Sequence, residues 1–577
     1  MIRKTLLCLF SIAVVRAQTS ANVYVQHNLV SSVPGMADVT DPNLIAPWGV
    51  SFSATSPFWV SNAGKGNTSV YNDSSSAGIT ISSTLVTIPA GGGKTTPSEP
   101  TGQVQNSTSG FLLANGKAAS FIFCTADGTI SAWNGGTVST VMVDFSPVGT
   151  IYYGMAIGTG SGAPLLYAAN FSFGKIDVFD TNFKLTSVPG GFGDATLPAG
   201  YAPYNIWPVN GQLLVTFALQ NATKTAAVAA VGNGIVDAFD FNGNFVKRIA
   251  TGGPLNAPWG VAEVGGNWGA ASNSYLIGNF GDGHINAFDL TTGALKATLQ
   301  DATGAVITLP GLWALTLGNG ASGGDNNYLY FTAAITSNGT QAGLLGSLAP
   351  PAQITGVHNA ASGPQAAIAP GEVVQLTGIT IGPRPAVTSP ALTSAVNATT
   401  SLGGTTVTVN GTPAPILYAF ADITNIIVPW GVTGTTANIV VTSGTTVSQT
   451  MTIPLAAAAP GMFQGATYNQ DGTPNTTSNP AAAGTVVVFY CTGMGQTDPP
   501  GQDGVRYGSL VLAETVAPVT ATIGGQTAQV IYAGSAPGQI AGVMQVEMVV
   551  PAGAGTGAVP VAITAGGISS TGGVFLK

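Results

Sequence analysis

The sequence predicts an all-β fold, in which a six-bladed β-propeller is followed by two immunoglobulin-like β-sandwich domains. Two observations carry this prediction: one short phrase recurs six times at a nearly constant spacing, and a different duplication occupies the C-terminal part of the chain. The composition agrees, because 79 Gly and 36 Pro among 577 residues suit short strands joined by tight turns. A chain of this length can bury several separate cores.

The N-terminus has the features of a targeting segment. Arg3 and Lys4 precede an apolar stretch over residues 5–15, and Val15-Arg16-Ala17 has the small residues of a cleavage site. We therefore expect residues 1–17 to be a signal peptide, and the mature protein to be secreted, extracellular or held at the cell surface.

Few charged residues remain after this segment. Only 7% of all residues are charged, and removing three cations with the signal peptide takes the formal charge from −8 to −11. No cluster of Lys and Arg is present to neutralise phosphates, and no later apolar run approaches the roughly 18 residues that span a bilayer. Nucleic acid and membrane insertion are therefore not expected.

The repeated phrase consists of a turn, an aromatic residue, a Gly and a β-branched or apolar residue. Its Gly slot falls at positions 49, 102, 154, 205, 260 and 314, with Asn and Ala replacing Gly at 205 and 314, so the steps are 53, 52, 51, 55 and 54 residues. Such a steady period in an all-β sequence indicates one supersecondary unit repeated around an axis. Residues 18–347 are therefore predicted to form the propeller.

Each repeat continues with strands of two kinds. An apolar strand that ends in Asn is predicted at residues 58–62, 166–170 and 275–279. A strand that ends in an aromatic residue and Asp or Asn is predicted at residues 130–134, 176–180, 236–240 and 285–289. The alternating segment 22–30 precedes the first repeat, and the sixth repeat lacks the aromatic-Asp ending. We therefore expect this segment to be the outer strand of the sixth blade and to close the ring.

The blade pattern, seen in Pro47-Trp48-Gly49-Val50, Pro258-Trp259-Gly260-Val261 and Phe179-Asp180, resembles the NHL type of propeller repeat. The chain is also similar, over about residues 22–347, to an uncharacterised family of exported bacterial proteins built from such blades. The resemblance implies a six-bladed NHL-like propeller outside the cell.

After a linker at 348–351, the sequence predicts one immunoglobulin-like domain at 352–456 and a second at 457–577. Residues 405–411 are matched downstream by residues 519–525, with short alternating strands and Asn-Gly or Gly-Gly turns that are typical of sandwiches.

Several C-terminal motifs carry a second resemblance, among them Asn359-Ala360-Ala361-Ser362, Ala369-Pro370-Gly371-Glu372 and Ala459-Pro460-Gly461-Met462-Phe463. Residues 359–577 are similar to an uncharacterised C-terminal domain family of the acidobacterial type, also called the Solibacter type. The resemblance implies an extracellular accessory module of immunoglobulin-like, TIG-like fold.

Catalytic machinery is sparse. The chain has no Gly-x-Ser-x-Gly motif, and its three His residues fall where exposed polar residues are ordinary. After signal cleavage only Cys124 and Cys491 remain, and we expect two small buried hydrophobic residues rather than a disulfide. No catalytic residue, cofactor or metal ligand is assigned.

One candidate binding site is the aromatic residue before each Gly slot. Five repeats have an aromatic residue there and the second has Thr101: Trp48, Tyr153, Tyr204, Trp259 and Trp313. Repetition around an axis places these rings at one height. They either pack between the blades or form an aromatic mouth that stacks on a neutral ligand such as a sugar.

A second candidate is the Asn that ends the next strand, at Asn62, Asn170 and Asn279. These side chains either form turns or surround the channel entrance, where they would bind hydroxyls or complete a metal shell. A central Ca²⁺ would follow from the second alternative.

The sequence therefore favours an exported, non-enzymatic binding or surface-associated protein, with the propeller face as the site for a neutral ligand such as a glycan. Another extracellular protein is the alternative partner. The rival hypothesis is a lactonase-like, metal-dependent propeller hydrolase or lyase with its site at the central channel, and a third is a purely structural surface component.

Overall fold

The computed structural model describes residues 22–577 except 75–77, 95–96, 161, 394–395 and 509–511. The signal peptide expected at 1–17 lies outside these residues. The described chain consists of strands, turns and three short 3₁₀ helices at Ser146–Val148, Gly269–Ala271 and Pro390–Leu392, which confirms the all-β prediction. None of its helices is long and apolar enough to cross a membrane.

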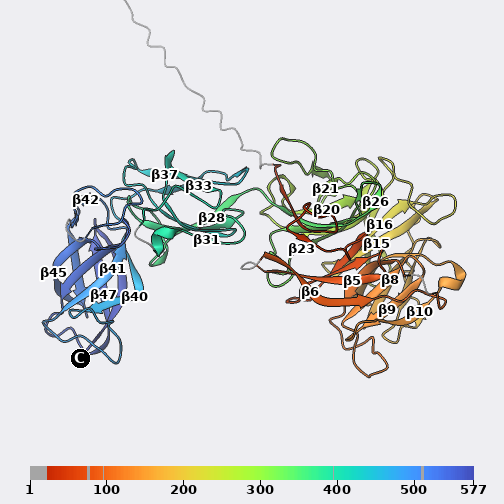
Figure 1. Ribbon diagram of the computed structural model, residues 1–577, viewed down its shortest axis with the longest axis horizontal. Helices are drawn as coiled ribbons and strands as arrows, with labels where there is room; N and C mark the ends of the chain where they lie inside the picture. Colours follow the sequence, from red (N-terminus) through yellow and green to blue (C-terminus); the bar gives the residue numbers. More distant parts are fainter. Residues whose placement is uncertain (1–21, 75–77, 95–96, 161, 394–395, 509–511) are drawn as a thin grey trace, which may run out of the picture.

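Within the described residues, the N-terminal part forms six sheets of four or five strands (Figure 1). The first three sheets contain β3 (Pro47–Ser51), β4 (Phe58–Asn62), β5 (Asn67–Ser74) and β6 (Gly78–Thr87); β7 (Pro100–Gln105), β8 (Phe121–Thr125), β9 (Thr129–Trp133) and β10 (Thr140–Asp144); and β11 (Tyr152–Gly160), β12 (Ala163–Asn170), β13 (Lys175–Phe179) and β14 (Leu185–Thr186). The fourth and fifth contain β15 (Tyr201–Val209), β16 (Gln212–Leu219), β17 (Ile235–Asp240) and β18 (Phe245–Thr251); and β19 (Pro258–Val264), β20 (Ser274–Asn279), β21 (Ile285–Asp289) and β22 (Leu295–Thr298).

The sixth sheet joins the two ends of this part of the chain. Its strand order is β2 (Val39–Thr40), β1 (Val25–Ser31), β27 (Leu344–Ala349), β24 (Leu329–Ala333) and β23 (Leu312–Leu317). β1 runs antiparallel to β27, so the strand expected at 22–30 is present and occupies an outer position. The linker predicted at 348–351 is wrong at its start: Leu348 and Ala349 belong to β27, because Leu348 is buried and Ala349 pairs with Val25.

The six sheets close into a ring. The first strand of each sheet contacts the first strand of the next, from β3 through β7, β11, β15 and β19 to β23, and β23 contacts β3. The Gly slot explains how these strands approach one another. A Cβ atom on Gly49 would lie 2.6 Å from the Thr101 carbonyl oxygen, and one on Gly102 would lie 2.8 Å from the Gly154 Cα. A side chain at either position would separate the strands.

The middle region, residues 353–454, has two main sheets that share a core. One sheet contains β29 (Gly363–Pro364), β28 (Gln353–Asn359), β30 (Val373–Ile379), β36 (Ile423–Ile427), β35 (Ile416–Phe420) and β31 (Val387–Thr388). The other contains β32 (Ser401–Leu402), β33 (Thr405–Val409), β34 (Thr412–Pro413), β37 (Thr436–Ser443), β38 (Thr446–Val447) and β39 (Met451–Pro454).

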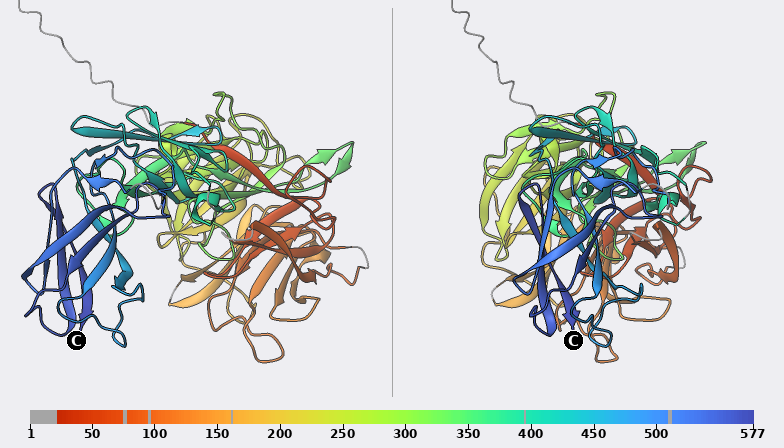
Figure 2. Two further views of the ribbon diagram at one scale, coloured as in Figure 1. Left: turned by 60° about the vertical axis from the view of Figure 1, so that its left-hand side comes forward. Right: turned by 90° about the vertical axis from the view of Figure 1, so that its left-hand side faces the viewer.

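The C-terminal region, residues 461–576, has its own core and one extended set of strands. They are β40 (Gly461–Asn469), β41 (Val486–Thr492), β42 (Thr497–Asp498), β43 (Glu514–Thr515), β44 (Val519–Ile523), β45 (Gln526–Ser535), β46 (Met544–Val549), β47 (Gly557–Ala565) and β48 (Ile568–Leu576). Figures 1 and 2 show the middle region between the ring and the C-terminal region. Cys124 and Cys491 are free and buried, one in the ring and one in the C-terminal region.

Candidate functional site

The five aromatic residues of the repeated slot meet at the centre of the ring and form what we call the central aromatic cluster. Trp48 stacks on Trp313 and Tyr153, with ring centroids 3.4 and 5.2 Å apart. Trp259 meets Trp313 edge to face at 5.8 Å, and Tyr204 meets Tyr153 in the same way at 5.3 Å. Trp259 and Trp313 are each only 4% exposed, and Trp48 is half-buried.

Two polar side-chain atoms of the cluster are engaged inside the protein, whereas the buried indole nitrogen of Trp313 has no hydrogen-bond partner among the described residues. Tyr153 donates to the Thr225 carbonyl at 2.6 Å, and the Trp259 indole donates to the Tyr153 carbonyl at 3.3 Å. Burial raises the pKa of Tyr153 to about 12 and that of Tyr204 well above its ordinary value, so both phenols stay neutral. Thr101, which occupies this slot in the second repeat, donates to the Tyr152 carbonyl at 2.7 Å. The rings therefore pack mainly on one another, and the four that are almost fully buried offer no open face on which a sugar could stack.

The three Asn residues at the ends of β4, β12 and β20 are also buried. Asn62 donates to Asn67 and Ser69, both at 2.8 Å. Asn170 donates to Asp177 at 2.7 Å, and Asn279 donates to the Pro254 carbonyl at 2.7 Å. Each amide holds neighbouring strands or loops together, and no described group of three or more His, Cys, Asp or Glu residues could hold a metal ion.

Beside the cluster, the channel is narrow. A cavity of about 70 Å³ is lined by residues of the first strands, including Gly49, Gln103 and Asn205. Gln103 donates to the Gly49 and Trp59 carbonyls at 2.7 and 2.8 Å, and Asn205 donates to the Trp259 carbonyl at 2.9 Å. This space is too small for a sugar ring, because ligand pockets usually occupy about 300–1,000 Å³.

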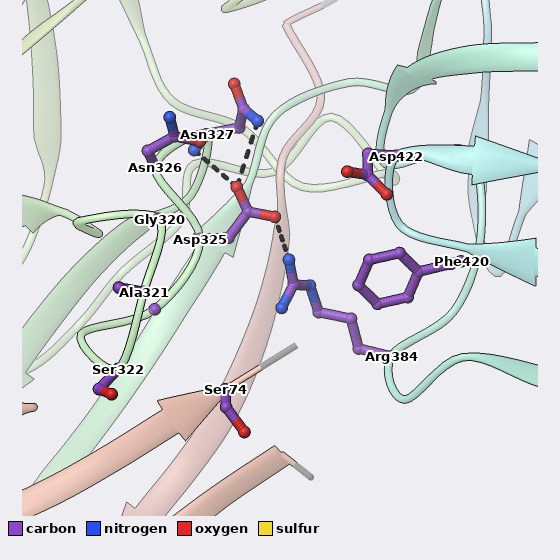
Figure 3. Close-up of a pocket in the computed structure, with 11 residues that line it drawn as sticks. Ser74, Gly320, Ala321, Ser322, Asp325, Asn326, Asn327, Arg384, Phe420 and Asp422 are labelled. Carbon is purple, nitrogen blue, oxygen red and sulfur yellow. Dashed lines mark hydrogen bonds and ion pairs between the residues drawn. The ribbon is translucent and has the colours of Figure 1, made fainter. Parts of the chain in front are cut away.

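A larger cavity, the junction pocket, lies between the ring and the middle region (Figure 3). Its volume is about 350 Å³. The ring contributes Ser74 at the end of β5 and the loop between β23 and β24, while the middle region contributes residues before β31 and at the turn between β35 and β36. The lining residues are Ser74, Gly320, Ala321, Ser322, Gly324, Asp325, Asn326, Asn327, Arg384, Phe420 and Asp422.

Arg384 fixes one wall of the pocket. Its guanidinium donates to the Asp325 carboxylate across the junction. It also lies over two aromatic rings, 5.2 Å from the Tyr328 centroid and 5.1 Å from the Phe420 centroid. Burial lowers the pKa of Arg384, but the nearby Asp325 carboxylate and the tyrosines outweigh burial, so its pKa is raised and the charge is permanent. One ion pair, to Asp325, and one cation–π contact, to Tyr328, therefore join the ring to the middle region, while the Phe420 contact lies within the middle region.

The loop that carries Asp325 is held in place by its own side chains. Asn319 accepts hydrogen bonds from the Ala321 and Gly323 amides, both at 2.9 Å, and donates to the Ser53 and Ser56 carbonyls of the first sheet. Asp325 accepts from the Asn327 amide at 2.8 Å. The polar rim is thus fixed before any ligand arrives.

Two side chains of the pocket have unused hydrogen-bonding capacity. Asn326 and Asp422 are exposed, and neither side chain makes a hydrogen bond or ion pair with another described residue. Figure 3 shows the Asp422 carboxylate beside the Phe420 ring, on the wall opposite Asp325. A ligand in this space meets amides, hydroxyls, carboxylates and the edge of an aromatic ring.

The sequence does not predict this pocket, although two features of the sequence mark residues that line it. Residues 318–327 interrupt the sixth repeat with a run of Gly, Asn, Ser and Asp, and Arg384 is one of only 15 Lys and Arg residues. Neither signal shows which residue of the middle region will face the loop.

Two relatives resemble the chain over more than half of its length. It is 31% identical over 332 residues to the uncharacterized protein R648 of Acanthamoeba polyphaga mimivirus, covering 56% of this chain and 78% of the relative. The chain belongs to this family. A second member, the uncharacterized protein L690 of the same virus, is 30% identical, and the match covers 84% of it. No family model matches the chain.

Two solved structures show a distant likeness to the chain. A protein of unknown function from Bacteroides thetaiotaomicron is 11% identical with a TM-score of 0.33, covering 57% of this chain and 73% of that one. An α-L-arabinofuranosidase from Fusarium graminearum, in complex with an iminosugar inhibitor, is 10% identical with a TM-score of 0.36, covering 57% of this chain and 98% of that one.

Proposed function

We propose that this family member is an exported binding protein that takes a hydroxyl-rich ligand, such as a glycan, in the junction pocket. The observation that carries the proposal is the composition of that pocket. Its walls combine amides, hydroxyls and carboxylates with one aromatic ring, in a volume of about 350 Å³. Pockets that bind small molecules generally pair a few fixed polar groups with apolar surface.

The scaffold in this proposal is a six-bladed, NHL-like propeller followed by two immunoglobulin-like domains. The closed contact between β23 and β3 and the pairing of β1 with β27 support the six-bladed count. The two-sheet core of the middle region and the matched strands β33 and β44 support the immunoglobulin-like assignment. The apolar segment at 5–15 supports export.

Two features favour binding at the junction over binding at the ring centre. The central aromatic cluster fills the ring centre, whereas Asn326 and Asp422 leave donors and acceptors open at the junction. The backbone of the loop that carries Asn326 is already held by Asn319 and Asp325, so less conformational entropy of the loop is lost when a ligand binds.

A glycan array probed with the full chain, followed by calorimetric titration of the saccharides that bind, tests the proposal. Asn326→Ala removes one open amide from the pocket and should weaken binding about tenfold, because it leaves ligand hydroxyls unpaired. Asn267→Ala changes an exposed Asn of the ring that does not line the pocket, and it should bind like the unmodified chain. If no saccharide binds, or if both variants bind equally well, the glycan site is not in this pocket.

A further inference from the structure

The junction pocket holds more negative than positive charge. Asp325 and Asp422 contribute two carboxylates, and Arg384 contributes the one guanidinium among the residues that line the pocket. Arg384 is already paired with Asp325 and stacked on Tyr328 and Phe420. The carboxylate of Asp422 forms no ion pair with a described residue.

The two carboxylates of the pocket also differ in how far their hydrogen-bond acceptors are used. An ionised carboxylate only accepts hydrogen bonds. Asp325 Oδ1 already accepts from the backbone and side-chain nitrogens of Asn327, at 2.8 and 3.2 Å, whereas both oxygens of Asp422 are free of described partners. The pocket therefore offers a charged acceptor, Asp422, whose oxygens no described donor meets.

We infer that the junction pocket selects an amino sugar, whose protonated amine pairs with Asp422. The inference rests on the proposed function and narrows it to one class of saccharide. An ammonium group supplies three donors and one positive charge, and charge-assisted hydrogen bonds are about twice as strong as neutral ones. The hydroxyls of the same sugar would then face Asn326 and the serines of the ring, while Phe420 would contact its carbon skeleton.

An acidic saccharide fits the pocket poorly. Its carboxylate would compete with Asp325 for the Arg384 guanidinium and would lie in the same pocket as Asp422. Carboxylates that share one small pocket repel each other. Breaking the half-buried ion pair between Arg384 and Asp325 would also leave the charge of Asp325 uncompensated.

Calorimetric titration of the full chain with three tetrasaccharides of equal length tests the inference. The three are built from glucosamine, N-acetylglucosamine and glucose, and the titrations are run at about pH 6, where a primary amine is protonated. The glucosamine tetrasaccharide should bind about tenfold more tightly than the other two, the gain expected from one charge-assisted contact. A lysine tripeptide, which offers amines without a sugar, should bind more weakly than the glucosamine tetrasaccharide.

Asp422→Asn keeps the size of the side chain and removes its charge, so it should abolish the preference for glucosamine. Asp289→Asn is the matched control, because Asp289 is a ring carboxylate outside the pocket whose turn can also form with Asn. This control should keep the tenfold preference.

The outcomes separate the inference from the proposed function. Equal affinity for all three tetrasaccharides, or a preference that survives Asp422→Asn, overturns the amine inference and leaves a saccharide site. A lysine tripeptide that binds as tightly as the glucosamine tetrasaccharide overturns the assignment to a sugar. If no saccharide binds, both the inference and the proposed function are overturned.

Discussion

At the scale of single residues, the same type of side chain can form a binding surface or a core. For the repeated aromatic residues, the width of the channel between the first strands decides between the two. The sequence places five large rings at one height around an axis. The six first strands that surround the axis approach closely at their Gly slots, so the channel between them is narrow. Rings that point into this channel contact each other, and the central aromatic cluster becomes a core.

Trp259→Ala should therefore destabilise the ring by about 3–5 kcal/mol, because the deleted indole leaves a cavity among Trp48, Trp313 and the Tyr153 carbonyl. Chemical denaturation of the full chain measures the change in the free energy of unfolding. Phe245→Ala, which truncates a 40% exposed ring on β18, is the control and should cost far less. A loss under about 1 kcal/mol for Trp259→Ala would place this ring at the surface instead.

Glu372 is a second residue whose surroundings change its chemistry, because burial favours the neutral form of its carboxyl group. Its carboxyl is fully buried, accepts hydrogen bonds from Asn359 at 3.0 Å and from the Ala369 amide at 2.7 Å, and has no cation beside it among the described residues. Burial outweighs these hydrogen bonds and raises the pKa of Glu372 to about 8. Asn359 also donates to the Ala459 carbonyl, so this carboxyl lies close to the contact between the middle and C-terminal regions.

The folded pKa of Glu372 is raised above its unfolded value of 4.5, so the folded protein holds this proton more tightly than the unfolded chain does. Stability from this group should be complete below about pH 4.5 and should fall by several kcal/mol as pH rises toward about 8. Unfolding curves at pH 5 and pH 8 measure the loss. Glu372→Gln, which cannot ionise, should remove most of the difference, and an unchanged pH dependence would show that another group causes it.

At the scale of elements, the sequence predicts those strands whose boundaries are set by their own residues. Residues 58–62 and 285–289 are strands with the predicted boundaries, because their patterning and their terminal Asn or Asp specify strand and turn together. The outer strand before the first repeat could be predicted because the sixth repeat lacks one. Residues 348–349 could not be assigned from local pattern, since what extends β27 is its pairing with β1, more than 300 residues away.

Deleting residues 22–31 should remove the strand that covers β27 and pull Tyr24 from its site, where its hydroxyl donates to the Trp268 carbonyl at 2.7 Å. Exposed strand edges and a lost buried ring should lower the unfolding midpoint and broaden the transition. Thermal unfolding followed by circular dichroism measures both, with a chain that starts at residue 22 as the control. A deletion variant that melts like this control would show that β1 does not support the ring.

At the scale of the whole molecule, sequence patterns predict a ring followed by two further regions, but they do not predict the pocket between the ring and the middle region. The period ends near residue 347 and a different duplication follows, and both signals are local in the sequence. The meeting of Arg384 with Asp325 depends instead on how the middle region lies against the ring. No periodicity encodes that placement. The repeated residues instead indicate a site at the ring centre, where the structure buries most of them.

The last prediction separates the folding of these regions from their joint function. Fragments 22–351 and 352–577 should each unfold cooperatively, because each contains complete hydrophobic cores of its own. Neither fragment should bind the saccharides that the full chain binds, since Asn326 lies on one and Asp422 on the other. Calorimetry of each fragment, alone and mixed, measures folding and binding separately. A ring fragment that binds as tightly as the full chain would move the site off the junction, and fragments that do not unfold cooperatively would place the boundary elsewhere.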